Sequence, residues 1–155
     1  MIVARTRAEL RRARCGLTDP TGLVPTMGAL HDGHIALLRA ARDRERSVVA
    51  TLFVNRAQFD DPNDFAAYPR DEKFDLNVFE ECGVDVVFVP NEDELYPNGL
   101  SSRIDAGPVA HGLEGVRRPG HFDGVAMVVA KLLYLTKPTC AYFGQKDWQQ
   151  TRVIA

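Results

Sequence analysis

The sequence lacks the cysteine pattern of a disulfide-bonded protein. Its 155 residues contain only three cysteines, Cys15, Cys82 and Cys140, which lie far apart and form no Cys-x-x-Cys pair. An odd, scattered set of thiols argues against a disulfide framework and is typical of proteins in a reducing cytoplasm, which is the location we expect. Because Cys82 and Cys140 lie in apolar runs, we expect both to be buried free thiols.

Long hydrophobic runs and an excess of one charge are also missing. No stretch approaches the length of a membrane-spanning helix, and the N-terminus has no apolar core of signal-peptide type. The formal net charge of −2 gives no electrostatic reason to expect a nucleic acid or a membrane as partner. Arginines are concentrated locally at Arg5, Arg7, Arg11, Arg12 and Arg14. We interpret them as the solvated face of a first helix, with a binding patch as the alternative.

Apolar strands that alternate with helices are what the sequence does contain. The apolar runs predict strands at 22–26, 47–54, 84–89 and 139–143, and the amphipathic segments predict helices at 6–14, 34–43, 71–82, 121–136 and 146–155. Two loop-rich stretches separate them, 55–70 and 90–118, the second with an extended piece expected at 101–106. This alternation predicts a single α/β domain in which helices cover both faces of a parallel sheet.

The most informative segment joins the strand 22–26 to the helix after it. It reads Met27-Gly28-Ala29-Leu30-His31-Asp32-Gly33-His34. Its glycines let backbone approach a ligand, and the free N–H groups and dipole of the following helix favour an anion. Two imidazoles beside such a site can donate hydrogen bonds to phosphate, which points to chemistry on a nucleoside triphosphate. The alternatives are two surface histidines or a metal pair, for which no further His or Cys cluster completes a ligand set.

Polar residues also follow the strands 47–54 and 139–143. Because ligands bind at the carboxyl ends of parallel strands, we expect these two ends and the histidine turn to line one cleft. After the strand 47–54, the amides of Asn55 and Gln58 can orient a small polar substrate, although a polar turn alone would also explain them.

The end of the strand 139–143 carries a denser set of polar residues. Gly144 permits close backbone approach, and Lys146 can meet a phosphate as a point charge. Asp147 either caps the next helix or helps to hold a magnesium ion, and Gln150 lies one turn further on the same side. Between the two strands, Arg117-Arg118-Pro119-Gly120-His121 is either an anion-facing loop or a structural loop with solvated arginines.

Together these segments resemble the pantothenate synthetase family. The matching segments, which fall in the order and at the spacing of that family, are Pro25–His34, Phe53–Asn55 with Gln58-Phe59, Tyr68–Arg70, Arg118–Phe122, and Gly144–Asp147 with Gln149-Gln150. The His-x-Gly-His turn alone is shared by a wider nucleotidyltransferase superfamily, so the resemblance implies its Rossmann-like, doubly wound parallel sheet. It also implies a ligase that joins pantoate to β-alanine with ATP and Mg²⁺ through a pantoyl adenylate, and releases AMP and pyrophosphate.

The resemblance assigns roles to particular residues. His34 is the expected catalytic residue, either as a proton donor or as an electrostatic stabiliser of the departing pyrophosphate. Gln58 and Gln150 would hold pantoate, and Gln58 would also contact β-alanine. Mg²⁺ would be held mainly by the ATP phosphates, with no metal site formed by the protein. ATP would be bound by Met27, Gly28, Ala29, Leu30, His31, Asp32, Gly33, His34, Gly144, Gln145, Lys146 and Asp147, and further candidates are Thr26, Asn55, Arg118 and His121.

The sequence departs from the family pattern in two places. Arg56 stands where the family usually has proline, which frees φ and adds a backbone donor, so the position of Gln58 is left open. The chain stops at Ala155 inside an apparent helix, before a final strand and the smaller C-terminal domain that the family carries. We therefore expect residues 1–155 to be an N-terminal ATP- and pantoate-binding domain, dimeric by resemblance, with negligible turnover alone.

Two other functions remain open from the sequence. One is an adenylyltransferase of the same superfamily that transfers AMP to a nucleotide or to phosphopantetheine. The other is a module that binds a ligand or mediates dimerisation without catalysis. Intact His31, His34, Lys146 and Asp147 argue against the second at the level of sequence.

Overall fold

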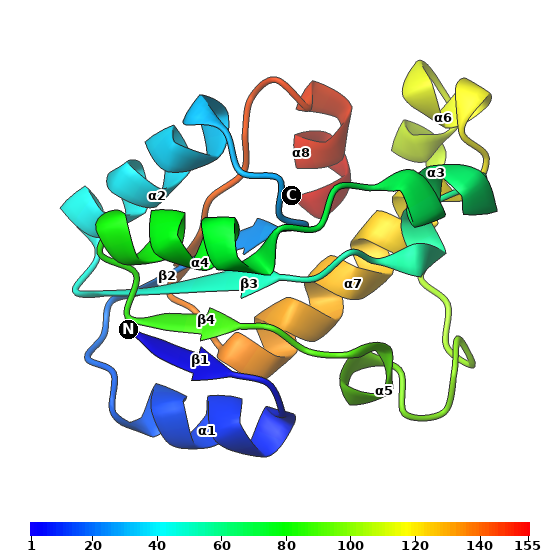
Figure 1. The fold of residues 1–155 in the computed structure, drawn as a ribbon. Helices are drawn as coiled ribbons and strands as arrows, with labels where there is room; N and C mark the ends of the chain where they lie inside the picture. The colour runs from blue at the N-terminus through cyan, green and yellow to red at the C-terminus, as the bar shows by residue number, and fades with distance from the viewer.

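A five-stranded parallel sheet forms the centre of the molecule. The computed structural model describes residues 1–155, and Figure 1 shows the sheet between its helices. The strands are β1 (Ile2–Ala4), β2 (Thr21–Thr26), β3 (Ser47–Leu52), β4 (Val86–Phe88) and β5 (Cys140–Ala141). Their order is β1-β4-β3-β2-β5, and every neighbouring pair is parallel. The predicted parallel α/β sheet is confirmed, and the chain turns back at β2, with β3 and β4 on one side and β5 on the other.

Helices cover both faces of this sheet. The helical segments are α1 (Arg7–Cys15), α2 (Asp32–Arg44), α3 (Pro62–Ala67), α4 (Glu72–Glu81), α5 (Glu92–Leu95), α6 (Glu114–Arg117), α7 (His121–Thr136) and α8 (Trp148–Ile154), with 3₁₀ turns η1 (Arg56–Gln58) and η2 (Pro108–Ala110). α2 and α4 lie on one face, and α1 and α7 lie on the other (Figure 1). None of the helices combines the length and the apolar character that crossing a membrane requires.

The core consists of two apolar layers because the central strands are buried on both sides. Along β3, Val49 packs into the layer of α1 and α7, while its neighbours Val48 and Ala50 pack into the layer of α2 and α4. Successive side chains of a strand point to opposite faces, so one uninterrupted apolar run supplies both layers. This is why the strands read as continuous hydrophobic stretches in the sequence.

Most differences from the predicted elements concern short segments. α7 has the bounds that its apolar stripe predicts, although Leu133 is only partly buried. β1 and the short helices within 55–70 and 90–118 were not predicted from the sequence. At 101–106, where an extended piece was expected, the chain forms no strand. The expected burial of two thiols is wrong: Cys82 is half-buried, and Cys140 is exposed in the edge strand β5, where no further strand covers it.

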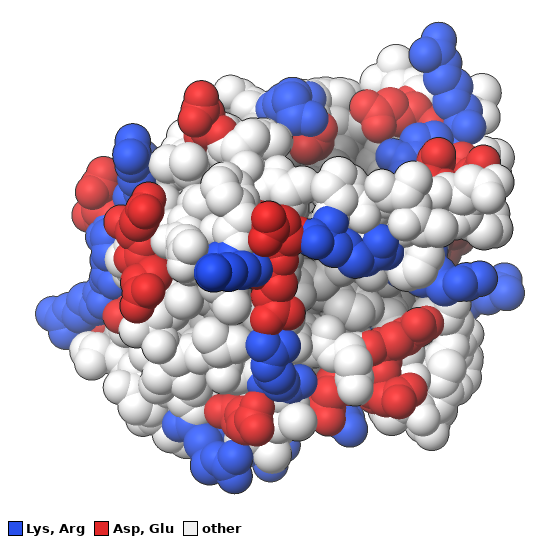
Figure 2. Space-filling model, viewed as in Figure 1, with Lys and Arg blue, Asp and Glu red and all other residues white.

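The arginines near the N-terminus lie on a solvated surface, as expected. Arg5 pairs with Glu72, Arg7 with Glu94 and Arg14 with Asp19, and exposed pairs of this kind add little to stability. Figure 2 shows Lys and Arg interspersed with Asp and Glu over the viewed face. This surface therefore offers no broad field of one sign to a charged partner.

Candidate functional site

The carboxyl ends of β2, β3 and β5 line one cleft, as the sequence predicts. The cleft consists of two adjoining hollows of about 150 and 250 Å³, which share Met27, Gln58, Tyr68, Asp147 and Gln150. Thr26, His34 and Asn55 also line the smaller hollow, and Arg118 and His121 line the larger. The cleft opens beside β2, where the chain order of the sheet turns back and α/β proteins bind their ligands.

A tight turn leads from β2 to α2 and is held by a buried carboxylate. Gly28 and Ala29 both have positive φ, of 83° and 52°. Asp75 of α4 accepts hydrogen bonds from the backbone N–H groups of Ala29 and Leu30, at 3.2 and 3.0 Å. Asp75 is only 1% exposed to solvent. A Cβ on Gly28 would lie 2.6 Å from the Asp75 carboxylate, so the turn needs a glycine at this position.

Sequence reasoning missed Asp75. It lies 45 residues beyond Leu30, and nothing in the histidine motif points to it. The available signal is weaker: Asp75 stands three and four residues before Val78 and Phe79, which puts an acidic side chain on the apolar stripe of the predicted helix 71–82. An acid on a buried face has to find hydrogen-bond donors elsewhere in the fold.

The two histidines cap the start of α2. His31 is the N-cap residue, and its Nδ1 accepts from Gly33 N at 3.1 Å. His34 reaches back one turn, and its Nδ1 accepts from His31 N at 3.4 Å. The ring centroids are 4.2 Å apart. This is the reciprocal arrangement of a capping box, built here from two imidazoles.

These bonds determine where each ring carries its proton. A backbone N–H can only donate, so each Nδ1 presents a lone pair and the ring proton is on Nε2. Burial, and then the neighbouring His31, lowers the pKa of His34 below its usual value, so its ring is neutral near neutral pH. A Cβ at Gly33 would lie 2.9 Å from Cε1 of His31 and displace that ring. The glycine of the motif therefore serves the histidine cap.

Gln58 is held in the cleft through its backbone. Its carbonyl oxygen accepts from His121 Nδ1 at 2.7 Å and from an Arg118 guanidinium nitrogen at 3.3 Å. Burial lowers the pKa of His121, so this ring too is neutral. His121 opens α7, and the loop that contains Arg118 precedes it, so this segment positions Gln58 as well as lining the cleft.

The arginine that replaces the usual proline leaves this turn intact. Arg56 occupies the first position of η1, where a backbone N–H has no intrahelical partner. Asn55 closes the turn, because its side-chain oxygen accepts a hydrogen bond from Ala57 N at 3.3 Å, and Asn55 is only 1% exposed. The position of Gln58, which Arg56 left open in the sequence, is therefore well defined.

The end of β5 contributes Asp147 and Gln150 to the cleft. The side chain of Asp147 makes no cap hydrogen bond at the start of α8, so the capping explanation of this residue is wrong. Its carboxylate instead accepts from Lys146 Nζ at 2.9 Å, which raises the pKa of that lysine. Lys146 is largely exposed and lines neither hollow. Gly144 and Gln145 also lie outside the two hollows.

Gln149 is a second residue whose role is not apparent from the sequence. Its residue is 6% exposed. Its Nε2 donates to the carbonyl oxygens of Val109 and Gly112, and its Oε1 accepts from Glu114 N at 3.0 Å. These three bonds fasten α8, which carries Gln150, to η2, to the loop after it and to the first residue of α6.

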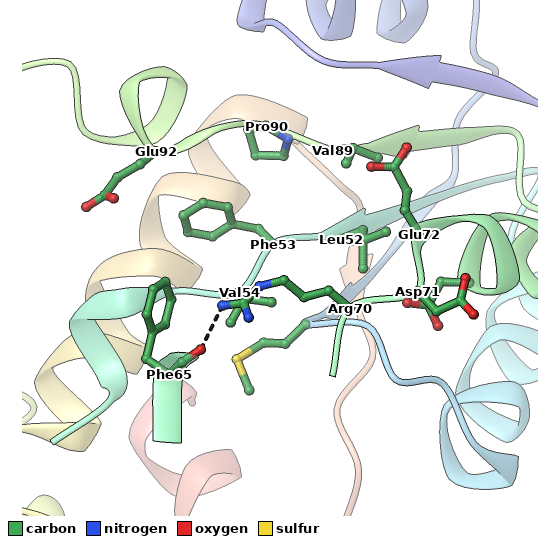
Figure 3. Close-up of a pocket in the computed structure, with 12 residues that line it drawn as sticks. Leu52, Phe53, Val54, Phe65, Arg70, Asp71, Glu72, Val89, Pro90 and Glu92 are labelled. Atoms are coloured by element: carbon green, nitrogen blue, oxygen red, sulfur yellow. Dashed lines mark hydrogen bonds between the residues drawn. The ribbon is translucent and has the colours of Figure 1, made fainter. Parts of the chain in front are cut away.

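A further cavity of about 280 Å³ lies at the ends of β3 and β4, and it shares Met27 and Phe53 with the smaller hollow of the cleft. Figure 3 shows the residues that line the cavity, among them Phe53 and Val54. The Arg70 side chain extends toward Phe65 and donates a hydrogen bond to its carbonyl oxygen. The Arg70 guanidinium also lies over the Phe65 ring, 4.9 Å from its centroid. No group of three or more His, Cys, Asp or Glu residues in the structure could hold a metal ion.

Asp75→Asn is expected to destabilise the protein and loosen the turn after β2. The amide would keep one acceptor and turn an N–H₂ group toward the other backbone N–H, so we expect a loss of about 1–3 kcal/mol. Chemical denaturation followed by circular dichroism measures this loss. The matched control is Asp71→Asn at the exposed N-cap of α4, where asparagine is equally suitable. Equal stability of the two variants would contradict the role given to Asp75.

Fold and site together define an α/β domain with a parallel sheet and a polar cleft beside the N-terminus of α2. Comparison with known proteins makes the assignment specific. The family model of pantoate–β-alanine ligase matches residues 2–155, and the chain belongs to that family. A relative from Roseiflexus sp. (strain RS-1), a pantothenate synthetase, is 54% identical over 154 residues, which cover 99% of this chain and 55% of that protein.

Solved structures give the same result. The pantoate–β-alanine ligase of Francisella tularensis, in complex with beta-gamma ATP and β-alanine, superposes with a TM-score of 0.96 at 43% identity and covers 99% of this chain and 60% of that one. The pantothenate synthetase of Thermus thermophilus gives 0.92 at 47% identity, over 99% and 55% of the two chains. The chain spans about half the length of the curated relatives it matches.

Proposed function

We propose that residues 1–155 are the ATP- and pantoate-binding domain of a ligase that joins pantoate to β-alanine. The observation that carries this proposal is the histidine cap of α2, which leaves the Nε2–H of His34 free of protein partners beside the cleft that holds Gln58 and Gln150. Neutral N–H donors at a helix N-terminus suit a polyphosphate, and amides suit a hydroxy acid that has to be oriented.

In the first step, an oxygen of the pantoate carboxylate forms a bond to the α-phosphorus of ATP. The bond from that phosphorus to the bridging oxygen breaks, and pyrophosphate leaves with the bonding electrons. Negative charge grows on the equatorial and departing oxygens, and the N–H of His34 stabilises it. Because His34 is neutral, we favour stabilisation of this charge over a literal proton transfer. His31, Asp32 and Gly33 contribute the helix start, and the turn Met27–Leu30 contributes backbone next to it.

In the second step, the amine of β-alanine attacks the acyl carbon of the pantoyl adenylate. The bond from that carbon to the AMP oxygen breaks, the nitrogen loses a proton, and pantothenate forms. We assign Gln58 and Gln150 to pantoate and Gln58 also to β-alanine. The two amides line both hollows, so they are placed to hold the pantoyl group through both steps.

ATP would extend from the histidine cap toward Gly144–Asp147. Lys146 is exposed and paired with Asp147, and we propose that it swings to the phosphates when ATP binds. The cleft offers only the carboxylates of Asp147 and Glu114 to a hard cation. Two carboxylates suit an Mg²⁺ that arrives on the ATP phosphates rather than a cage formed by the protein. We further propose a homodimer and a cytoplasmic location, which sedimentation and cell fractionation test.

Calorimetry with this chain tests ligand binding. We expect ATP·Mg²⁺ to bind, and pantoate to bind more tightly when a non-hydrolysable ATP analogue is present. No heat with any nucleotide would contradict the proposal and favour a purely structural module. Binding of phosphopantetheine in place of pantoate would favour the other adenylyltransferases.

Pantoate-dependent exchange of pyrophosphate into ATP tests the chemistry. We expect exchange from the full reading frame that contains these residues and negligible pantothenate formation by residues 1–155 alone. Exchange driven by phosphopantetheine but not by pantoate would overturn the substrate assignment. Robust pantothenate formation by residues 1–155 would contradict the proposal that these residues bind ATP and pantoate but do not complete the reaction alone.

A further inference from the structure

The direction of the Gln58 amide decides which ligand atoms this part of the cleft can bind. An amide presents N–H₂ donors at one end and an acceptor oxygen at the other, and a carboxylate ligand can use only the donors. In the structure, Gln58 Oε1 accepts from Asn55 Nδ2 at 3.1 Å, and Gln58 Nε2 lies 3.0 Å from the sulfur of Met27. Met27 lines both hollows, so the donor end of Gln58 is on the side of the cleft.

Backbone groups fix the direction of the neighbouring Asn55 amide. The N–H of Ala57 can only donate, and it faces Asn55 Oδ1 at 3.3 Å. The carbonyl of Gly124 can only accept, and it faces Asn55 Nδ2 at 3.1 Å. Tyr96 Oη donates to the same Oδ1 at 2.9 Å, and burial raises the pKa of Tyr96 to about 12, so its hydroxyl keeps its proton.

One hydrogen of Asn55 Nδ2 bonds the Gly124 carbonyl. The other points at the Gln58 amide, where it needs an acceptor. A reversed Gln58 would place two N–H₂ groups against each other in a buried site. The Asn55 hydrogen that does not bond Gly124 would then lose its acceptor, and the Gln58 N–H₂ group would find none at residue 55. We propose that Asn55 is a positioning residue that sets the direction of the Gln58 amide, so that its N–H₂ group faces the cleft and selects a carboxylate ligand. That this carboxylate belongs to pantoate rests on the proposed function, whereas the direction of the amide does not.

Nuclear magnetic resonance of the unmodified chain tests the direction without any ligand. We expect nuclear Overhauser contacts from the two Gln58 Nε2 protons to the Met27 methyl group, and from the Asn55 Nδ2 protons to the Gly124 region. Contacts from the Gln58 Nε2 protons to Asn55 in place of Met27 would overturn the proposal. This measurement stands even if a variant of Asn55 fails to fold.

Asn55→Asp tests what the direction does for binding. The new carboxylate can only accept, so Gln58 is expected to turn its N–H₂ group toward residue 55 and its oxygen toward the cleft. We expect the affinity for pantoate to fall by about ten- to a hundredfold, and that for the neutral amide of pantoate to fall much less. The matched control is Asn91→Asp, which adds the same charge at the exposed N-cap of α5.

Comparison of pantoate with its neutral amide separates a positioning role of Asn55 from a purely structural role. Equal losses for pantoate and its amide in Asn55→Asp would mean that Asn55 has only a structural role, and would overturn this inference. If the unmodified chain shows the expected Overhauser contacts but binds neither ligand, the proposed function fails and the direction of the amide stands. If pantoate binds but the contacts show the reverse direction, the inference fails and the proposed function stands.

Discussion

His34→Ala is expected to slow adenylate formation by about 10²- to 10³-fold in the full reading frame. That range is typical for the loss of one preorganised donor to a transition-state oxyanion. The variant removes the Nε2–H that His34 directs from the first turn of α2, and it leaves the cap made by His31 and Gly33 in place. Pantoate-dependent ATP–pyrophosphate exchange measures the effect. A near-normal exchange rate would contradict the role of His34.

His111→Ala is the matched control for this variant. His111 is exposed in the loop after η2 and lines neither hollow of the cleft, so we expect exchange at the normal rate.

The pH profile of the exchange rate separates the two roles considered for His34, which are stabilisation of charge and donation of a proton. A neutral donor predicts a rate that falls in acid, below the lowered pKa of His34, as the ring becomes charged and the His31 N–H loses its acceptor. A rate that rises as the ring is protonated would favour literal proton donation.

Gly124→Ala is expected to destabilise the protein and displace Gln58. Helix propensity alone favours alanine by about 1 kcal/mol at a position inside α7. A Cβ at this position would, however, lie 2.2 Å from the Ala57 carbonyl oxygen and 2.8 Å from the Gln58 Cα, both of them backbone atoms. Backbone cannot rotate out of the way as a side chain can, so α7 has to move off η1, at an overpacking cost of about 1–3 kcal/mol.

Denaturation midpoints and pantoate affinity together measure this effect. The steric cost exceeds the gain in propensity, so we expect lower stability and weaker pantoate binding. Gly16→Ala is the control, because its Cβ would meet only the Ala13 oxygen at an ordinary 3.5 Å and its φ of −88° suits alanine. A Gly124→Ala variant that is as stable as Gly16→Ala would contradict the close contact between α7 and η1.

The sequence was sufficient to predict the elements whose signal is local and repeated. The apolar stripe of α7 predicts its bounds, a short buried run predicts β2, and a continuous β-branched run predicts β3. The convergence of three strand ends also follows from sequence, because parallel strands end at one edge of a sheet. The three-residue β1 was missed because it is too short for a periodic pattern.

Features that depend on distant partners could not be predicted. Asp75 serves a turn that lies 45 residues earlier, and Asn55 takes its direction from Gly124, which is 69 residues later. Cys140 reads as buried because its neighbours are apolar, yet it lies in an edge strand, and strand order is not visible in a local run. In each case the deciding contact is tertiary, while the sequence pattern describes only the residue's own segment.

The histidine cap has a consequence for which parts of the fold the site depends on. Every atom that sets the tautomers of His31 and His34 belongs to residues 31–34, and the glycine that makes room for the first ring lies among them. Residues 31–34 therefore form a local motif that fixes the orientation of both N–H donors by itself. From the rest of the fold the motif needs a brace for the turn before it, which the buried Asp75 supplies here.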